Sequence, residues 1–208
     1  TFAMESVYRF VFWGVTGTTD VAVTDVNGDG YADIVTANWG TDGVSVLLNN
    51  GAGAYGPAST YSINLHASMP WHIAVMDVNG DAKADIIATD IDNYTVSVLL
   101  NNGAGGFGTA SVYMGKPESY GIAVADVNGD NKADIITASY SGDTVSVLLN
   151  NGAGTFGLPS VYNMNNVGTS FGPRDITVAD VNGDSKADIV TADYSHGTVS
   201  VLLNNGAG

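Results

Sequence analysis

The chain has 208 residues, enough for one sizeable hydrophobic core, and 45% of them are hydrophobic, but no apolar run approaches the about 18 residues that span a membrane. Acidic residues outnumber basic ones by 21 to 6, and the net charge of −15 excludes nucleic acid as an expected partner and favours cations. The absence of cysteine excludes disulfides and thiol chemistry. We expect a single domain over residues 1–208, without membrane insertion.

The chain begins with TFAMESVYRF at residues 1–10 and ends with NNGAG at residues 204–208. Joined end to start, these two segments read like NNGAGTFGLPSVY, which stands inside the chain at residues 150–162. The sequence therefore starts and stops within one repeated phrase.

Two phrases recur along the chain. VSVLLNNGAG occurs four times without change, and DVNGD also occurs four times, with its copies 52, 49 and 54 residues apart. Self-similarity at such a period indicates a repeat architecture. The predicted repeats are approximately residues 1–53, 54–105, 106–154 and 155–208.

Each repeat is predicted to contain four short strands separated by Gly, Asn and Asp turns. In the third repeat these are GIAVAD, ADIITA, TVSVLL and the SVY that follows, and no helical period is present. Both faces of VSVLL can be buried, which is typical of a sheet packed on both sides. The pattern predicts an all-β fold, a β-propeller of four-stranded blades with four repeats per chain.

The phrases VADVNGDNKADIITA and TVSVLLNNGAGTFG resemble the FG-GAP/VCBS repeats, which are related to the propeller repeats of integrin α-subunits. The resemblance covers almost the whole chain. It implies that DVNGD links the innermost strand to the second, that VSVLLNN is the third strand, and that SVY is the outermost. The N-terminal strand at residues 1–10 would then pair with the last blade and close the ring, which hides a sheet edge.

Three arrangements remain open at this point. Four blades close alone in one chain, two chains form a homodimer with an eight-bladed ring, or the chain is an in-phase slice of a longer array. The resemblance also implies an extracellular or cell-surface protein that acts as an adhesion or protein-binding module.

Three GxGxxG segments, at residues 51–56, 103–108 and 152–157, fit the spacing of a dinucleotide-binding loop. Such a loop opens a helix whose N-terminus faces the pyrophosphate, whereas here a strand is predicted to follow. We interpret these glycines as hairpin positions with positive φ.

The DVNGD segments predict about four structural Ca²⁺ sites per chain. Side-chain oxygens fall at positions 1, 3, 5 and 9 of each loop, and position 7 offers a backbone carbonyl, a spacing that begins like a calcium loop. The last aspartate is expected to supply the bidentate contact, and the backbone rather than the side chain of position 7 is expected to face the ion. The predicted ligands are Asp25, Asn27, Asp29, Tyr31 and Asp33; Asp77, Asn79, Asp81, Lys83 and Asp85; Asp126, Asn128, Asp130, Lys132 and Asp134; and Asp180, Asn182, Asp184, Lys186 and Asp188.

The alternative for each loop is a metal-free turn held by Asp and Asn side chains. Without a cation, three carboxylates that converge in each loop would repel one another by several kcal/mol at short range, which favours calcium.

A ligand-binding face is predicted where the repeats differ, in the loops opposite the calcium loops. Aromatic rings beside amides, carboxylates or an arginine suit the recognition of peptides or sugars. A carbohydrate-binding lectin is therefore the alternative to the protein-binding module. The candidate residues are Trp39, Trp71, His72, Tyr120, Tyr140, Arg174 and Tyr194.

Enzyme chemistry is not expected, because no nucleophile stands near an obvious base in the sequence. The segment Asn93-Tyr94-Thr95 is a glycosylation sequon, with meaning only in a glycosylating secretory pathway.

Overall fold

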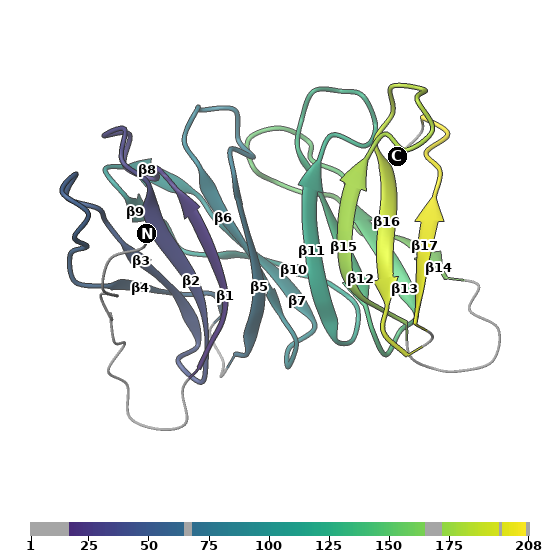
Figure 1. The fold of residues 1–208 in the computed structure, drawn as a ribbon, viewed down its shortest axis with the longest axis horizontal. Helices are drawn as coiled ribbons and strands as arrows, with labels where there is room; N and C mark the ends of the chain where they lie inside the picture. The colour runs from purple at the N-terminus through teal and green to yellow at the C-terminus, as the bar shows by residue number, and fades with distance from the viewer. Residues whose placement is uncertain (1–16, 65–67, 165–171, 196, 207–208) are drawn as a thin grey trace, which may run out of the picture.

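The computed structural model describes residues 17–64, 68–164, 172–195 and 197–206, and within them every regular element is a β-strand (Figure 1). The strands form four antiparallel sheets that follow one another along the chain, and each sheet is called a blade below. In the part of the chain that the structure describes, no helix is suited to cross a membrane.

The strands of the four blades have the following bounds. They are β1 (Gly17–Thr24), β2 (Asp33–Trp39), β3 (Gly43–Leu47) and β4 (Ser59–Ser62); β5 (Pro70–Met76), β6 (Asp85–Asp90), β7 (Thr95–Leu99) and β10 (Ser111–Met114); β11 (Ser119–Ala125), β12 (Asp134–Ser139), β13 (Thr144–Leu148) and β14 (Ser160–Asn163); and β15 (Pro173–Ala179), β16 (Asp188–Asp193) and β17 (Thr198–Leu202). A short hairpin of β8 (Asn101–Gly103) and β9 (Gly106–Phe107) lies between β7 and β10.

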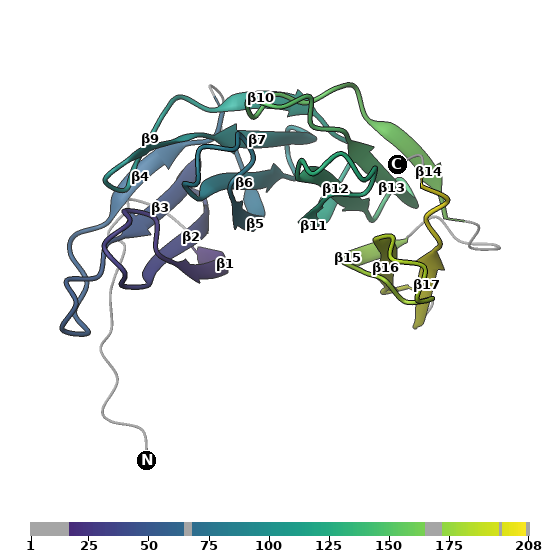
Figure 2. The same ribbon diagram turned by 90° about the horizontal axis from the view of Figure 1, so that it is seen from above.

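Each blade is a simple meander in which a strand pairs with the next strand of that blade, and in the second blade the β8–β9 hairpin lies between β7 and β10. Figure 2 shows β1, β5, β11 and β15 on the inner side of an arc and β4, β10 and β14 on its outer side. The four strands predicted for the third repeat are confirmed to within a few residues at their ends. The prediction of hairpin glycines with positive φ is confirmed for the first two glycines of each GxGxxG segment, such as Gly152 and Gly154 with φ values of 89° and 68°, but not for the third, such as Gly157. A strand follows each segment.

The hydrophobic core lies between successive blades. Val44 and Val46 of β3 belong to the same buried cluster as Ile73 and Ile86 of the second blade, and similar clusters join the later blades. All five residues of β3, β7 and β13 are buried, which confirms that VSVLL is covered on both faces. Burial of the repeated valines therefore fixes each blade against its neighbour.

The described blades form an open arc with the first blade at one end and the fourth at the other (Figure 2). Among the described residues the fourth blade has three strands, and β17 is its last. The strand predicted at residues 1–10 lies outside the described residues, so its pairing with β17 stays a prediction.

Candidate functional site

The DVNGD loops lie between the first and second strands of each blade and are closed by hydrogen bonds to aspartate. In the first loop, Oδ1 of Asp25 accepts the backbone N–H groups of Asn27 at 3.2 Å, Gly28 at 2.7 Å and Asp29 at 3.3 Å. Its Oδ2 accepts the N–H of Gly30 at 2.7 Å. These contacts, led by that of Gly30, hold the pKa of Asp25 below its ordinary value, so the carboxylate stays charged.

Position 5 of three loops is paired with the lysine at position 7. Nζ of Lys83 lies 2.9 Å from Oδ2 of Asp81, and the backbone N–H of Lys83 donates to the other oxygen at 3.0 Å. The same ion pair recurs in the next two loops at 2.9 and 3.4 Å. Hydrogen bonding from Lys83 lowers the pKa of Asp81. The position-7 side chain of these three loops therefore turns toward the acidic group at position 5, whereas the sequence led us to expect only its backbone to face the site.

The first loop differs because Tyr31 occupies position 7. There, Nδ2 of Asn27 donates to Oδ2 of Asp29 at 2.9 Å, and the N–H of Tyr31 donates to Oδ1 at 2.8 Å. Asp29 thus has no ammonium partner among the described residues.

The aspartate at position 9 has a structural role that the spacing did not reveal. Oδ2 of the buried Asp33 accepts the N–H of Val26 at 2.9 Å, and Oδ1 accepts the N–H of Asn49 at 2.8 Å. The carboxylate therefore clamps the loop to the residues that follow the third strand. The same clamp is formed by Asp85, Asp134 and Asp188.

Burial is the main influence on the pKa of two of these position-9 carboxyl groups. Desolvation raises the pKa of Asp85 and of Asp134, although the backbone N–H groups of Asn101 and Asn150 oppose the shift. Each oxygen of these clamps accepts one backbone N–H group, and the bidentate contact of the position-9 aspartates with calcium stays a prediction.

The chemistry of the donors at positions 1, 3 and 5 fits a hard cation, since every side chain offers carboxylate or amide oxygen. Within the described ranges, however, no three acidic or histidine side chains converge as a metal-binding group. The loops instead show the Asp and Asn hydrogen bonds of a closed turn. Calcium therefore remains an expectation carried by the composition of the loops.

At the other end of the strands, β-bulges place the predicted ligand-binding residues. The register of the innermost strand shifts between Pro70 and Ile73, between Ser119 and Gly121, and between Pro173 and Asp175. The residues inside these shifts are Trp71 with His72, Tyr120, and Arg174. A bulge re-aims the side chain it carries, and here it does so at the same end of three blades.

The re-aimed side chains form a continuous line with tyrosines from the turns after β12 and β16. Trp71 and Tyr120 make an edge-to-face contact with ring centroids 5.2 Å apart, Tyr120 and Tyr140 one at 5.7 Å, and Tyr140 and Tyr194 one at 6.3 Å. We call these four residues the aromatic row. It runs across the second, third and fourth blades, and Tyr194 at its end is 66% exposed.

Arg174 lies among the tyrosines of the aromatic row. Its Cζ is 4.9 Å from the ring centroid of Tyr120, 5.4 Å from that of Tyr140 and 4.7 Å from that of Tyr194. Three rings hold the guanidinium by cation–π attraction, and no carboxylate pairs with it among the described residues. Its N–H groups form a fixed set of donors beside a row of rings.

Two predicted residues do not join the row among the described residues. Trp39, which is 38% exposed, ends β2 in the first blade. His72 is half-buried, and its backbone N–H donates to Oγ1 of Thr89 at 3.2 Å. At the sequon, Nδ2 of Asn93 donates to Oδ2 of Asp90 at 2.8 Å.

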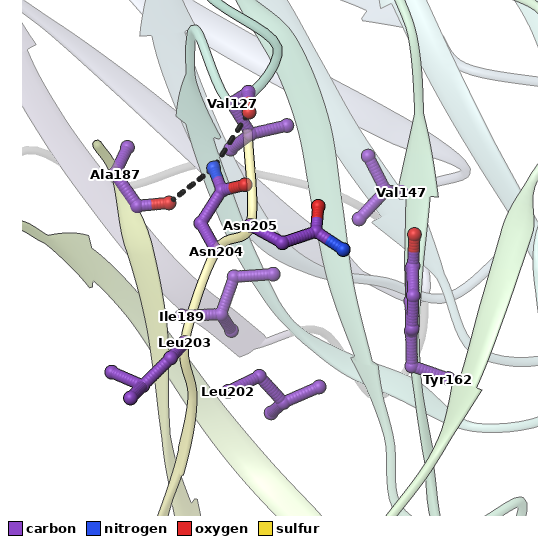
Figure 3. Close-up of a pocket in the computed structure, with 9 residues that line it drawn as sticks. All are labelled: Val127, Val147, Tyr162, Ala187, Ile189, Leu202, Leu203, Asn204 and Asn205. Atoms are coloured by element: carbon purple, nitrogen blue, oxygen red, sulfur yellow. Dashed lines mark hydrogen bonds between the residues drawn. The ribbon is translucent and has the colours of Figure 1, made fainter. Parts of the chain in front are cut away.

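A cavity of about 310 Å³ lies away from the aromatic row, at the joint between the third and fourth blades (Figure 3). Its lining is mainly apolar and includes Tyr162 of β14 and Leu202 of β17. Nothing in the repeat pattern alone indicated a hollow at this joint.

Comparison with solved structures places the chain beside proteins of the same fold. A lectin from Agrocybe aegerita, solved for its specific recognition of non-reducing terminal N-acetylglucosamine, is 29% identical with a TM-score of 0.56. The match covers 89% of this chain and 52% of the lectin chain, so this chain spans about half its length. The V. cholerae biofilm matrix protein Bap1 is 21% identical with a TM-score of 0.52, over 91% of this chain and 30% of that one. Comparison with curated proteins finds no match.

The repeats themselves match a known family. The FG-GAP-like repeat is found at residues 25–88, 77–137 and 126–191, three overlapping stretches that each begin at one DVNGD loop and extend past the next. Together these stretches cover more than half of the 208 residues. The resemblance seen in the repeated phrases is confirmed, and the chain belongs to the FG-GAP-like repeat family.

Proposed function

We propose that this chain is a calcium-stabilised carbohydrate-binding module of the extracellular space or cell surface, and that the aromatic row is its binding face. The coarser statement, a protein- or glycan-binding module, is supported by the FG-GAP-like repeats and by the similarity to a lectin. The observation that carries the proposal is the row of Trp71, Tyr120, Tyr140 and Tyr194 around Arg174.

The chemistry of sugars fits this face. A pyranose presents an apolar face that stacks on aromatic rings, and its hydroxyl groups accept hydrogen bonds from fixed donors. The guanidinium of Arg174 is such a donor, and three rings restrict its position. Because the row crosses three blades, it suits a chain of sugars better than a single small molecule.

A glycan array with matched variants tests the proposal. We expect the 208-residue chain to give reproducible hits in calcium-containing buffer. Tyr194→Ala should weaken these hits at least tenfold, because it removes one ring of the aromatic row. The fold should tolerate this change, because Tyr194 is exposed and supports little of the core. Leu158→Ala removes another exposed apolar side chain, away from the row, and should leave binding unchanged. An array without hits, or hits that survive loss of Tyr194 and of Arg174, would contradict a glycan-binding row.

A protein-binding module is the second candidate, and the composition of the same row favours it. Tyrosine, tryptophan and arginine are the residues that dominate binding energy at protein interfaces. If the row binds a protein partner, the glycan array is silent while Tyr194→Ala abolishes capture of that partner. The same variant thus separates the two candidates.

Calcium is proposed to stabilise the module through the DVNGD loops. Positions 1, 3 and 5 would supply side-chain oxygens, with Asp126, Asn128 and Asp130 as the example of the third loop, and the ion would offset the charge that these loops concentrate. Its role would be structural. No residue in this proposal takes part in a reaction at the metal.

Native mass spectrometry combined with thermal melts tests the metal. We expect about four Ca²⁺ per chain, one fewer in Asp126→Ala, and a melting temperature that falls by many degrees on chelation and returns with calcium. Asp92→Ala removes an exposed carboxylate outside the loops and should keep the full number of ions. A melting curve that chelation leaves unchanged would refute a stabilising calcium.

A ring that carries these sites would need a fourth strand in the last blade, which has three strands among the described residues. We propose that a segment with the sequence of residues 1–10 forms the fourth strand of the last blade. The support is the phrase TFAMESVY, which places Ser, Val and Tyr as in the outer strand β14.

A further inference from the structure

Arg174 carries a positive charge within the aromatic row and has no acidic partner there. It is half-buried, and its Cζ lies 4.9, 5.4 and 4.7 Å from the ring centroids of Tyr120, Tyr140 and Tyr194. Among the described residues, no side-chain N–H of Arg174 donates to a carboxylate, a hydroxyl or a carbonyl oxygen. Cation–π attraction therefore holds the charge but leaves the guanidinium without an oxygen acceptor.

The other basic side chains that the structure describes divide between the two ends of the strands. Lys83, Lys132 and Lys186 pair with aspartates of the DVNGD loops. Lys116 lies in the connection from β10 to β11, at the end of the third blade that carries the row, and forms no ion pair within the described ranges. The two basic groups that no described acid neutralises, Lys116 and Arg174, thus lie at the same end of the strands.

Hydrogen bonds fix the segment of Lys116 beside two rings of the row. Oγ of Ser119 donates to the carbonyl of Lys116 at 2.9 Å, and Tyr120 is the next residue. The backbone N–H of Tyr140 donates to the carbonyl of Glu118 at 3.0 Å. Glu118 itself forms no ion pair in the described part of the chain. The segment 116–118 is therefore tied to the third blade next to the row, and its ammonium group keeps its charge.

Most acidic residues lie at the other end of the strands. Each of the four DVNGD loops has three aspartates, which makes twelve of the 21 acidic residues of the chain. The strand β15, which carries Arg174, has seven residues, or roughly 20 Å at about 3.3 Å per residue. Salt screens charges within about 8 Å at physiological ionic strength. The net charge of −15 therefore acts weakly at the row and does not prevent an anion from binding there.

The acidic residues next to the row in sequence are engaged in their own blade. Asp193 is 1% exposed, and its carboxylate accepts the hydroxyl groups of Thr191 at 2.9 Å and Thr198 at 3.2 Å. Oδ1 of Asp175 accepts the backbone N–H of Ile176 at 2.9 Å. Neither aspartate forms an ion pair with the guanidinium beside it.

An arginine in this setting favours a ligand that carries a carboxylate. The planar guanidinium matches a carboxylate through two parallel N–H···O bonds, which are stronger than bonds to a neutral hydroxyl. A neutral sugar offers hydroxyl and amide oxygens only. It would leave the charge of the half-buried Arg174 unpaired.

We propose that the aromatic row prefers an acidic sugar, whose pyranose ring carries a carboxylate, and that Arg174 determines this preference. The proposal rests on the proposed function of the row as a sugar-binding face. The carboxylate pairs with the guanidinium, the pyranose ring contacts the tyrosines around it, and Lys116 adds attraction at longer range. Neutral sugars bind the same row more weakly.

A matched pair of oligosaccharides tests the preference. The acidic probe is a tetrasaccharide of alternating glucuronic acid and N-acetylglucosamine, and the neutral probe is its methyl ester, which keeps the rings and loses the charge. In calcium-containing buffer at neutral pH, calorimetry should give the acidic probe an affinity at least tenfold above that of the ester, and added salt should narrow this difference. Arg174→Gln keeps an amide donor but removes the charge. It should weaken binding of the acidic probe at least tenfold and leave that of the ester within about threefold.

A control variant separates a local effect of Arg174 from a change in net charge. Leu158→Glu lowers the net charge by one, as Arg174→Gln does, but at a side chain that is 92% exposed and outside the row, so the preference should persist. Melting curves show whether both variants are folded, and the comparison of the two probes on the native chain needs no variant.

The outcomes distinguish this preference from the function on which it rests. Equal affinity of the native chain for the acid and its ester would overturn the preference, and neutral hits on the glycan array would then leave the sugar-binding row standing. A preference that survives in folded Arg174→Gln would overturn the role of Arg174. Silence of the array for acidic and neutral sugars alike would refute the sugar-binding face itself.

Discussion

Single residues in the DVNGD loops carry the charge of this molecule, and their environments differ by loop. Lys83 lowers the pKa of Asp81 by a hydrogen bond, whereas the first loop has Tyr31 and leaves its acidic groups to backbone and amide donors. The repeated letters suggested four equal loops, and the sequence placed the lysines at position 7. It could not show that their ammonium groups turn back onto position 5, because side-chain direction depends on the closed turn.

The pH dependence of this pair follows from the direction of the shift. A lowered pKa means that the Asp81–Lys83 contact adds stability above the ordinary value of 3.8, and that this stability is lost as pH falls through the lower folded value. In calcium-free buffer, Lys83→Met should raise the pKa of Asp81 toward 3.8 in carboxyl NMR titrations. The pKa of Asp25 in the first loop should stay where it is. An unchanged Asp81 titration in the variant would disprove the ion pair.

Arg174 offers a second test at the scale of a residue. Three tyrosine rings surround its guanidinium, and a planar, stacked cation is not replaced by an ammonium group. We expect Arg174→Lys to weaken ligand binding by about tenfold and Arg174→Ala by more, with small changes in melting temperature. Equal binding by the lysine variant and the native chain would show that only the charge matters.

At the scale of strands and loops, the buried aspartates at position 9 hold the blades in register. Asp134 accepts N–H groups from Val127 and Asn150, which belong to the loop and to the residues after the third strand. Without that acceptor, two buried N–H groups lose their partner. Each costs about 1–3 kcal/mol of stability.

Substitution of this clamp should therefore be more costly than substitution of a loop ligand. We predict that Asp134→Ala loses roughly 2–6 kcal/mol in urea unfolding without calcium, that Asp134→Asn loses less because one acceptor remains, and that Asp126→Ala loses least. The raised pKa of Asp134 adds a pH trend, since its contribution is fully present below 3.8 and falls as pH rises through the folded value. A gap between native and Asp134→Ala chains that widens with rising pH would contradict this sign.

Much of the strand and turn structure was predictable, because every repeat carries the same sequence pattern. Alternating apolar letters in VSVLL and the turns at DVNGD and NNGAG located the strands, and burial of Val44 and Val46 on one face follows from the same pattern. The bulges that aim Trp71, Tyr120 and Arg174 were not predictable, since register is decided between strands rather than along one. The clamp by Asp33 and its copies was hidden for the same reason.

At the scale of the whole molecule, one kind of joint between blades is repeated along the arc. Three joints repeat one arrangement of valines, isoleucines and an asparagine hydrogen bond. The repeat count was evident from the sequence. The open arc was not, because curvature results from small rotations at each joint.

The aromatic row is proposed to bind a ligand, and side-chain NMR tests this most directly. In calcium-containing buffer, a saturating oligosaccharide with terminal N-acetylglucosamine should shift the ring signals of Trp71, Tyr120, Tyr140 and Tyr194 and the side-chain signals of Arg174. The signals of Tyr31, in a DVNGD loop at the other end of the strands, should not move. Shifts confined to the DVNGD loops, or none with any ligand that the array or a partner screen provides, would contradict the account.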